Sequence, residues 1–508
     1  MIIDGSGFGD SRDTSYVEIG GSSLVSSLYL SWTDSQIKVM IPTDVQDGLV
    51  YVITKGGKSE PKIFTNKESI PVAVRQEKRT SLPVILSISP QNLSVGQVVN
   101  ISGENFGSVR NTSAVYFTPQ WKEGKNSSSD MENIEQSFIQ ALDNNFDYEY
   151  WSDTEIKVRV PDGAMSGYFF VATEKGTSNR MKVTIDSPVG TKNFMGKLTY
   201  LIELSADISD VKGENDSLIT LRIPRPQPSA CQPYIQMTES IPKPIFDDHE
   251  KSVIHHLQTK DYDGKTEKIV FKQNFVIPVY AITSNITASK VQKLSEKNRL
   301  LYSVYTNPDK CIPSDSPIVN KLASEITQKE TNPYLCAKLI YDYIIENYSL
   351  LYVMDTIEKD PLTMIETKKG DSYDFAIIFC ALARAAGIPS IPISGILVDR
   401  GKNTRNHWWC EIYLEKFGWF PVDPALGAGM QFDLYNLPED CKSFYFGSID
   451  AQHVAFSRGW NDTKSSIINN NTVYRPKTYA LQSIWEEYST GTTSYSSFWA
   501  DPIVLGIY

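Results

Sequence analysis

KGDSYDFAIIFCALARAAGIP, residues 369–389, is the strongest structural signal in this chain. Asp371 can accept hydrogen bonds from the free N–H groups that begin a helix, and Asp374 follows three residues later, which is a capping pattern. Gly387 and Pro389 form a stop signal at the other end. The run between them is apolar apart from a single arginine, which predicts a buried helix. The N–H groups and dipole at its start could stabilise a thiolate or an oxyanion.

Two strand-like segments follow this predicted helix. The segment NHWWCEIY, residues 406–413, alternates as a strand does, and WFPVD, residues 419–423, ends a second strand with an acid. Position 372 at the helix start, His407 on the first strand and Asp423 after the second therefore come in a fixed order. These three residue types suit a nucleophile, a general base and a carboxylate that orients the base.

Together these motifs resemble those of the transglutaminase-like superfamily. The family pattern is Gly-x-Cys at a helix start, then Arg-x-x-Gly-Ile-Pro, His-x-Trp and Trp-x-x-x-Asp. The matching segments here are GDS at 370–372, RAAGIP at 384–389, HWW at 407–409 and WFPVD at 419–423. The match covers roughly residues 317–460 and is specific as a set, although each piece alone is weak. The resemblance implies a papain-like α+β core with Ser372, His407 and Asp423 as its catalytic residues and no cofactor.

One position departs from this pattern, because Ser372 stands where the family has its nucleophilic cysteine. A thiol of pKa about 8.5 can ionise beside a protonated histidine and a helix start, whereas a hydroxyl is far too basic to do so. A serine would need His407 as a strict general base. The sequence leaves three accounts open: an inactivating substitution, a natural pseudoenzyme, and a working serine variant.

The N-terminal part of the chain contains an internal repeat. Residues 3–9 match residues 101–107, an offset of 98, and residues 32–39 match residues 151–158, an offset of 119. The change in offset predicts an insertion of 21 residues in the second copy, within the polar stretch 121–145. Both copies are short alternating segments separated by glycine and proline, which is typical of a β-sandwich. Their Gly-Phe-Gly turns resemble those of IPT/TIG domains, which are immunoglobulin-like modules.

These patterns predict a multidomain protein with two or three N-terminal β-sandwich (Ig-like) domains before an α+β papain-like transglutaminase-fold core. The expected domains are residues 1–75, 80–188, a β-domain at 190–312, and the core with a C-terminal tail at 313–508. The first copy lacks an opening strand that residues 83–90 supply in the second. We therefore expect that Met1 lies inside a domain and that a signal or anchor preceded it.

Composition narrows the class of protein. A chain of 508 residues with 41% hydrophobic and 21% charged residues is an ordinary globular protein of three or four domains. The formal net charge of −11, with no basic cluster, argues against nucleic acid as a partner. No apolar run reaches the roughly 20 residues of a transmembrane helix.

The cysteines and His453 are expected to have no catalytic role. No CxxC pair occurs, so no zinc or other metal site is expected. Cys380 lies about two turns into the predicted helix and cannot replace Ser372. His453 resembles a late segment that lines the cleft of such cores, and we interpret it as a structural histidine. Disulfide pairing cannot be deduced from the six cysteines: Cys231, Cys311, Cys336, Cys380, Cys410 and Cys441.

The resemblance implies acyl transfer on a protein or peptide amide at a bacterial cell surface, in the periplasm or outside the cell. Hydrolysis and cross-linking are equally compatible with it. The competing class is a non-catalytic surface protein that binds a peptide or a cell-wall or surface glycan in a silenced cleft. The residue at position 372 in the native gene separates the two classes, because a native cysteine there would indicate an enzyme and not a pseudoenzyme.

Overall fold

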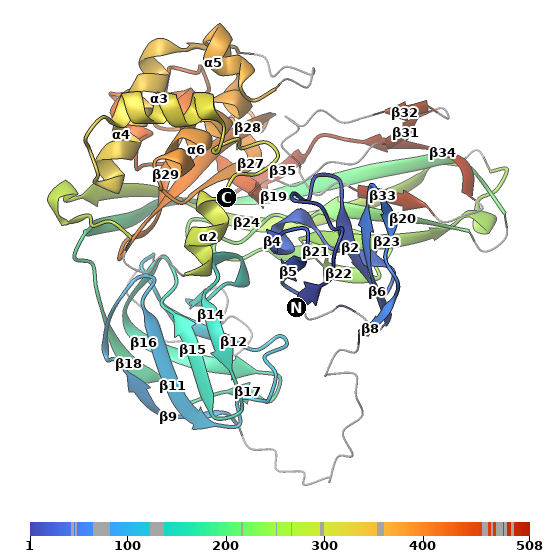
Figure 1. The fold of residues 1–508 in the computed structure, drawn as a ribbon, viewed down its shortest axis with the longest axis horizontal. Coiled ribbons are helices and arrows are strands. Elements are labelled where there is room, and N and C mark those ends of the chain that lie inside the picture. The colour runs from blue at the N-terminus through green and yellow to red at the C-terminus, as the bar shows by residue number, and fades with distance from the viewer. Residues whose placement is uncertain are drawn as a thin grey trace.

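The computed structural model describes residues 1–41, 45, 48–64, 82–121, 137–214, 217–249, 251–265, 267–294, 299–352, 360–459, 466–468, 471–473, 481, 485–488 and 492–508. The predicted limit at residue 75 and the middle of the predicted insertion, 122–136, lie outside these residues. The described chain is rich in strands, and its helices gather in the C-terminal part (Figure 1). The predicted fold class, Ig-like modules before a mixed core, is confirmed.

The first repeat, residues 1–64, is a small β-sandwich around one apolar core. One sheet has the order β1-β5-β4 and the other the order β3-β2-β6-β7, with β8 also on β6. The strands are β1 (Ile2–Asp4), β2 (Tyr16–Ile19), β3 (Ser22–Ser23), β4 (Tyr29–Trp32), β5 (Gln36–Val39), β6 (Gly48–Thr54), β7 (Gly57–Lys58) and β8 (Lys62–Phe64).

The second repeat, residues 83–186, has the same plan with longer strands. Its sheets have the orders β14-β15-β11-β9 and β10-β18-β16-β12-β13, with β17 on β16. The strands are β9 (Val84–Ser89), β10 (Asn92–Ser94), β11 (Val98–Glu104), β12 (Ala114–Pro119), β13 (Ile139–Gln140), β14 (Tyr148–Trp151), β15 (Glu155–Arg159), β16 (Ala164–Thr173), β17 (Gly176–Thr177) and β18 (Met181–Asp186).

Equivalent aromatic pairs close the two sandwiches in the same way. In the first repeat the rings of Phe8 and Trp32 meet edge-on, with centroids 6.4 Å apart at 64°. In the second repeat Phe106 and Trp151 meet at 6.5 Å and 60°. Both tryptophans end a strand, β4 or β14, that pairs with the next strand of its sheet. The predicted repeat register is therefore confirmed by contacts that the sequence comparison did not use.

The turn after each phenylalanine is also the same. Gly9 N–H donates to Asp34 Oδ1 at 2.9 Å, and Gly107 N–H donates to Asp153 Oδ1 at 2.9 Å. Gly9 has φ +88° and Gly107 has φ +94°, a left-handed conformation that glycine adopts without strain. The Gly-Phe-Gly pattern therefore marks a position where the backbone itself requires glycine.

Two very long strands dominate the next region, which we call the long-stranded sandwich: residues 190–286 and 485–507. Strand β19 (Gly190–Gly213) runs antiparallel to β24 (Ile269–Ile286), and β21 (Gln236–Ile241) continues the sheet beyond β24. The facing sheet has the order β22-β23-β20-β33. Its strands are β20 (Leu218–Pro224), β22 (Phe246–His249), β23 (Ser252–Gln258) and β33 (Trp485–Tyr488).

The C-terminal strands belong to this sandwich by hydrogen bonding. Strands β34 (Thr492–Trp499) and β35 (Ile503–Ile507) pair with β19, and β33 pairs with β20. The predicted domain 313–508 includes this tail with the core, whereas in the structure Trp499 pairs with Ala206 of β19. The physical reason is that β19 and β20 would otherwise present open sheet edges, which a returning chain segment can cover.

The C-terminal core, residues 299–459, combines a four-stranded sheet with a helical layer. The sheet order is β29-β28-β27-β30, from β27 (Ser390–Val398), β28 (Thr404–Leu414), β29 (Gly418–Val422) and β30 (His453–Arg458). The helices are α2 (Leu300–Thr306), α3 (Pro317–Thr327), α4 (Pro333–Asn347), α5 (Thr363–Thr367), α6 (Ser372–Ala385), α7 (Pro424–Gly427) and α8 (Cys441–Phe444). Two short pairs, β25 (Ser349–Leu350) with β26 (Lys369–Gly370) and β31 (Ser466–Ile468) with β32 (Asn471–Val473), are the remaining described strands.

Helix α6 is the centre of this core and confirms the predicted helix. All but two of its 14 residues are buried, and it contacts β27 and β28 as well as α3 and α4 (Figure 1). The guanidinium of Arg384, the one buried charge on it, donates to the carbonyl oxygens of Ser390 and Asn307. The helix therefore fixes the start of β27 and the loop after α2 by hydrogen bonds as well as by packing.

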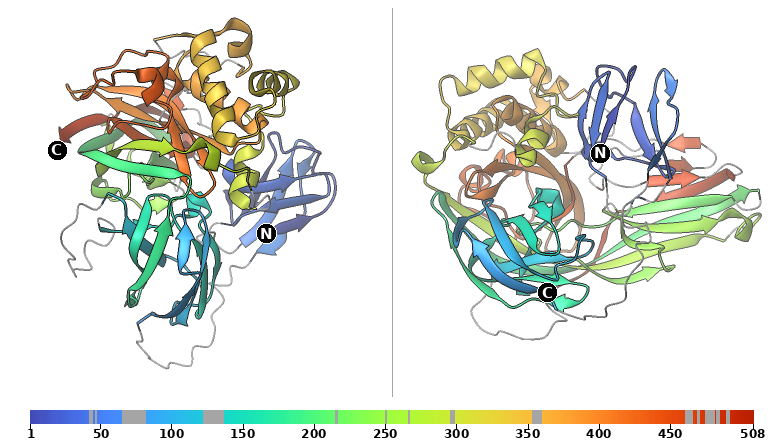
Figure 2. Two further views of the ribbon diagram at one scale, coloured as in Figure 1. Left: turned by 90° about the vertical axis from the view of Figure 1, so that its left-hand side faces the viewer. Right: turned by 60° about the horizontal axis from the view of Figure 1, so that its bottom comes forward.

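A buried ion pair joins the second repeat, the long-stranded sandwich and the core. Lys192 Nζ on β19 donates to Asp162 Oδ1 at 2.6 Å, to Asp162 Oδ2 at 2.8 Å and to the carbonyl oxygen of Trp419 at 2.6 Å. Asp162 also accepts the Trp419 N–H at 3.2 Å. Figure 2 shows these three parts in contact from two further directions. Removing one partner would leave a buried charge unpaired, so the contact fixes the core on its neighbours.

Candidate active site

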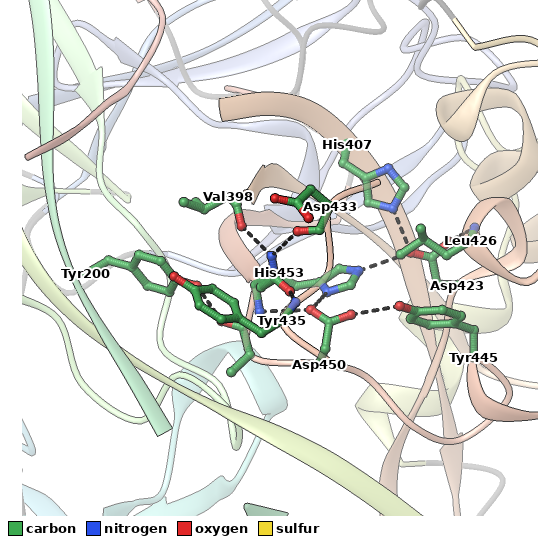
Figure 3. A network of polar contacts seen from close by, with 12 residues as sticks. Tyr200, Val398, His407, Asp423, Leu426, Asp433, Tyr435, Tyr445, Asp450 and His453 are labelled. Carbon is green, nitrogen blue, oxygen red and sulfur yellow. Dashed lines mark hydrogen bonds and ion pairs between the residues drawn. The ribbon is translucent and has the colours of Figure 1, made fainter. Parts of the chain in front are cut away.

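Asp423 is the acceptor on which the polar site of the core is built. It follows β29 and caps α7, where its Oδ1 accepts the Leu426 N–H at 2.9 Å. Its Oδ2 lies 2.6 Å from His407 Nε2 and 3.1 Å from His453 Nε2 (Figure 3). The side chain is fully buried. One carboxylate oxygen therefore accepts hydrogen bonds from two histidines.

His407 lies on β28 and is fully buried. Its ring stacks on Trp409, with centroids 6.1 Å apart at 17°, and meets the His453 ring edge-on at 5.6 Å. Nε2 is engaged by Asp423, while Nδ1 has no hydrogen-bond partner among the described residues. The ring is thus fixed by one nitrogen and two aromatic neighbours, and its other nitrogen is free to exchange a proton.

Ser372 is the first residue of α6 and is buried. The next residue, Tyr373, meets Trp408, the residue after His407, with ring centroids 5.1 Å apart at 81°. This contact places the start of α6 against the part of β28 that carries the histidine. No hydrogen bond joins Ser372 to His407 in the described chain, so the meeting of these two residues stays a prediction.

The capping at the start of α6 is more complete than the sequence indicated. Asp371 Oδ1 accepts the N–H groups of Tyr373 and Asp374 at 2.9 and 3.3 Å, and Asp374 Oδ2 accepts the Asp371 N–H at 3.0 Å. The first-turn N–H groups that we expected to bind an anion are therefore partly occupied by the protein's own carboxylate. Of these donors, the Ser372 N–H is the one that the capping side chain does not use.

The sequence did not reveal Asp450 as part of the site, and it indicated only a structural role for His453. His453 Nδ1 lies 3.0 Å from Asp450 Oδ1, so the ring links Asp450 to Asp423. Asp450 also accepts the Gln452 N–H at 2.8 Å and the Tyr445 hydroxyl at 2.9 Å (Figure 3). The signal available in the sequence was the Asp-x-x-His spacing at 450–453, which is too short and too common to be read as part of a site.

The two histidines of this hydrogen-bond network differ in pKa. Burial tends to lower the pKa of His453, but the Asp450 charge and the hydrogen bonds to both carboxylates raise it to about 9. Burial lowers the pKa of His407, and the Asp423 charge offsets this only in part. Burial alone would raise the pKa of Asp423, but the two histidines hold it below its usual range. At neutral pH His453 is a cation and His407 is a neutral base.

His407, Asp423 and His453 are also the described residues whose donor atoms could surround a metal ion, since one atom of each lies within 4.8 Å of the others. A histidine that donates from both ring nitrogens has no lone pair for a metal. His453 donates to Asp450 and Asp423, and Asp423 Oδ2 already accepts two hydrogen bonds. In this form the donor set suits a hydrogen-bond network and not a metal centre.

The cysteines take no part in this network. All six lie in the described chain and none forms a disulfide. Cys380 on α6 and Cys410 on β28 are buried in the core, and Cys410 Sγ donates to the Val422 carbonyl oxygen at 3.3 Å. Both behave as small buried apolar residues.

A family model for the transglutaminase-like superfamily matches residues 320–424, which contain Ser372, His407 and Asp423. The chain contains a transglutaminase-like core. A second model, for the IPT/TIG domain, matches residues 1–67 and 83–200, the two repeats and the start of the long-stranded sandwich. The recognised architecture, IPT/TIG modules followed by a transglutaminase-like core, is thereby confirmed.

Individual relatives of the transglutaminase-like core and its modules are distant. An uncharacterized protein of Haemophilus influenzae is 33% identical over 171 residues, which is 28% of this chain and 46% of that protein. The match thus spans less than half the length of this curated relative.

Two solved structures are similar over a large part of the chain. One is a Cytophaga hutchinsonii protein provisionally described as a cysteine protease, with 13% identity, 62% of this chain and 93% of that chain covered, and a TM-score of 0.36. The other is the periplasmic domain of TgpA from Pseudomonas aeruginosa, with 15% identity, 61% and 86% coverage, and a TM-score of 0.26. The family models, and not these weak likenesses, support the assignment of the transglutaminase-like core.

Proposed function

We propose that the transglutaminase-like core is an acyl-transfer scaffold for protein or peptide amides. Ser372 occupies the nucleophile position, His407 is the general base and Asp423 orients it. The observation that supports this assignment is the state of His407, whose Nε2 is held by Asp423 at 2.6 Å while the buried Nδ1 has no partner in the described residues. A fixed imidazole with one free nitrogen is what proton transfer to and from a nucleophile requires.

The reaction that fits this arrangement has two balanced steps. The nucleophile at 372 gives its proton to His407 Nδ1 and attacks the amide carbonyl carbon, and the carbon–nitrogen bond then breaks as the leaving amine takes that proton. An acyl-enzyme remains. Water or a second amine then attacks it, releases an acid or a new amide, and returns the proton to residue 372. The Ser372 N–H is a donor for the developing oxyanion.

Serine makes this scaffold slow in the first step. A cysteine can attack as a thiolate paired with protonated His407, whereas a hydroxyl must lose its proton to the base during attack. The protein with Ser372 is therefore a silenced form, whether by substitution or as a natural pseudoenzyme, or else a serine variant with low turnover. All three accounts share the same scaffold and the same serine, and they differ in how Ser372 arose and in whether it turns over.

We also propose an extracellular, periplasmic or cell-surface location in a bacterium. In the described part of the chain, no helix is long and apolar enough to cross a membrane. Tandem immunoglobulin-like modules before a hydrolase-type core suit a protein that holds its active domain away from an anchor. Burial protects most of the six thiols, none of which forms a disulfide, in an oxidising compartment, since four are buried and two are partly exposed.

An activated ester tests the proposed function without knowledge of the natural substrate. We expect Ser372→Cys to release a burst of nitrophenolate from p-nitrophenyl acetate that approaches one equivalent per chain, because the thiol accepts the acetyl group and deacylation follows more slowly. The unaltered protein should show no burst. Intact mass should locate one acetyl group, and peptide mapping should place it at residue 372.

The control for this burst is Ser372→Cys combined with His407→Ala, which should lower the acylation rate by about 10²–10⁴-fold. A folded Ser372→Cys protein with no burst above the unaltered chain would contradict the proposed acyl transfer. That outcome would favour the second candidate, a binding protein for a peptide or glycan, for which the serine at position 372 is the supporting observation.

A further inference from the structure

His407 and His453 share the Asp423 carboxylate, and their contacts with it differ in length. His407 and His453 both present Nε2 to the same oxygen, at 2.6 and 3.1 Å (Figure 3). Asp423 Oδ1 accepts the Leu426 N–H, and both histidine contacts fall on Oδ2. A positive charge on either histidine is therefore stabilised by a carboxylate that the other histidine also contacts.

Of the two histidines, His453 is the one more readily protonated to a cation. Its Nδ1 faces Asp450 and its Nε2 faces Asp423, so both nitrogens must carry protons to donate to the two carboxylates. His407 faces one carboxylate only and keeps Nδ1 unpaired. A buried histidine between two carboxylates retains its second proton more readily than one beside a single, shared carboxylate.

We propose that His453 is a positioning residue that holds His407 as a neutral imidazole through their shared carboxylate, with Asp450 keeping His453 charged. The catalytic use of this coupling rests on the proposed acyl-transfer function. The electrostatic coupling itself exists whether or not the core is catalytic. The raised pKa of His453 and the lowered pKa of His407 agree with it in direction.

The long-stranded sandwich fixes the turn that contains Asp450 and leads to His453. The Tyr200 hydroxyl on β19 donates to the Ala451 carbonyl oxygen at 2.8 Å. Gln452 donates to the carbonyl oxygens of Val398 and Asp433 at 2.7 and 3.0 Å and accepts the Tyr435 N–H at 2.6 Å (Figure 3). The turn before β30 is thus held by hydrogen bonds from β19, from the end of β27 and from residues 433–435, which fixes the position of His453.

Several charged or titratable groups affect the pKa values of His407 and His453 from the elements packed around them. They are Asp450 from the turn before β30, Asp423 from the start of α7, Tyr445 after α8, and Arg405 on β28, which lowers the pKa of His407. The two carboxylates stabilise His453 as a cation, and Arg405 adds to the effect of His453 on His407. No described neighbour reverses the sign of the proposed coupling.

A neutral His407 determines how the side chain at position 372 loses its proton. A neutral His407 can accept a proton from the residue-372 side chain at once, which a hydroxyl nucleophile requires. The same cation on His453 opposes a permanent thiolate–imidazolium pair, because the Asp423 charge is already partly neutralised. The network therefore favours proton transfer during attack over a preformed ion pair.

The coupling can be measured without a substrate, on the full chain labelled with nitrogen-15 at its five histidines. Nitrogen–proton correlation spectra of the imidazole rings report the protonation and tautomer of each ring as pH is changed. In the unaltered protein we expect His453 to carry two ring protons at neutral pH and His407 to carry one, on Nε2. His453→Gln should raise the proton affinity of His407 by about tenfold or more, because it removes a nearby positive charge.

Asp450→Asn is the second variant, since it keeps an acceptor for His453 Nδ1 but removes the charge that holds the ring protonated. It should also raise the proton affinity of His407. The matched control is His255→Gln, which removes a buried histidine hydrogen-bonded to Gln273 at 2.8 Å in the long-stranded sandwich. This control should leave the titration of His407 unchanged.

Two results would overturn the proposal: a singly protonated His453 at neutral pH in the unaltered protein, or a His407 titration that neither variant moves. The first needs no variant, so it decides the question even if His453→Gln fails to fold. Because no acyl transfer is measured, a core without activity in the ester assay can still confirm the coupling. An active core with unchanged His407 titration would refute the coupling alone.

Discussion

In the Ser372→Cys protein, residue 372 is expected to be the thiol that iodoacetamide alkylates fastest at pH 6. A thiol there can pass its proton to the neutral His407 as it attacks, so it reacts at a pH where an ordinary thiol of pKa about 8.5 is mostly protonated. We expect a rate about 100-fold above that of an ordinary thiol. Quantitative peptide mapping over a pH series measures it.

The native thiols give a low background in this experiment. Burial raises the pKa of four of them: Cys231, to about 11, Cys336, Cys410 and Cys441. Adding His407→Ala should return residue 372 to the pH profile of an ordinary thiol, while His255→Gln, a buried histidine outside the core, should not. A residue-372 thiol that reacts no faster than the partly exposed Cys441, in a folded protein, would show that His407 does not activate this position.

Asp423→Ala is expected to cause the largest loss of stability of any single substitution in the site. It removes the acceptor for His407 and His453 and the cap of α7, and it leaves the buried His453 cation with one carboxylate in place of two. Breaking a buried ion pair costs about 3–5 kcal/mol, with about 1 kcal/mol more for a lost helix cap. The core should then open locally far more often than in the unaltered protein.

Hydrogen exchange of peptides from α6 and β28, followed by mass spectrometry, measures this change, because a multidomain chain need not unfold in one transition. Asp433→Ala is the matched control. That carboxylate lies in the same core but is exposed, and it bonds Arg400 Nε at 2.8 Å. It should leave exchange in α6 and β28 unchanged. Equal protection in the two variants would mean that Asp423 does not hold the site together.

Local signals in the sequence predicted the parts of the site that are close in the chain or strongly patterned. The capping pair Asp371 and Asp374, the apolar run of α6 and the alternation of β28 each reflect interactions within a few residues. The strand-end position of Asp423 followed from the same reasoning, and its pairing with His407 needs only the antiparallel register of β28 and β29. The repeat was visible because its glycine turns need particular residues.

The parts that the sequence could not show depend on contacts between distant segments. His453 reaches Asp423 only because β30 pairs with β27, across a connection that no local pattern specifies. The C-terminal strands pair with β19 and β20, more than 250 residues earlier, which leaves no trace in their own composition. The occupied helix start was also hidden, since capping and anion binding use the same N–H groups.

The distance between Ser372 Oγ and His407 Nδ1 in a crystal structure tests the central claim most directly. The account predicts that these atoms approach within about 4 Å, with His407 Nε2 still bonded to Asp423 and no other group on Nδ1. A structure in which Ser372 points away from His407, or in which Nδ1 is bonded elsewhere so that no rotation of either side chain brings the two atoms together, would contradict it.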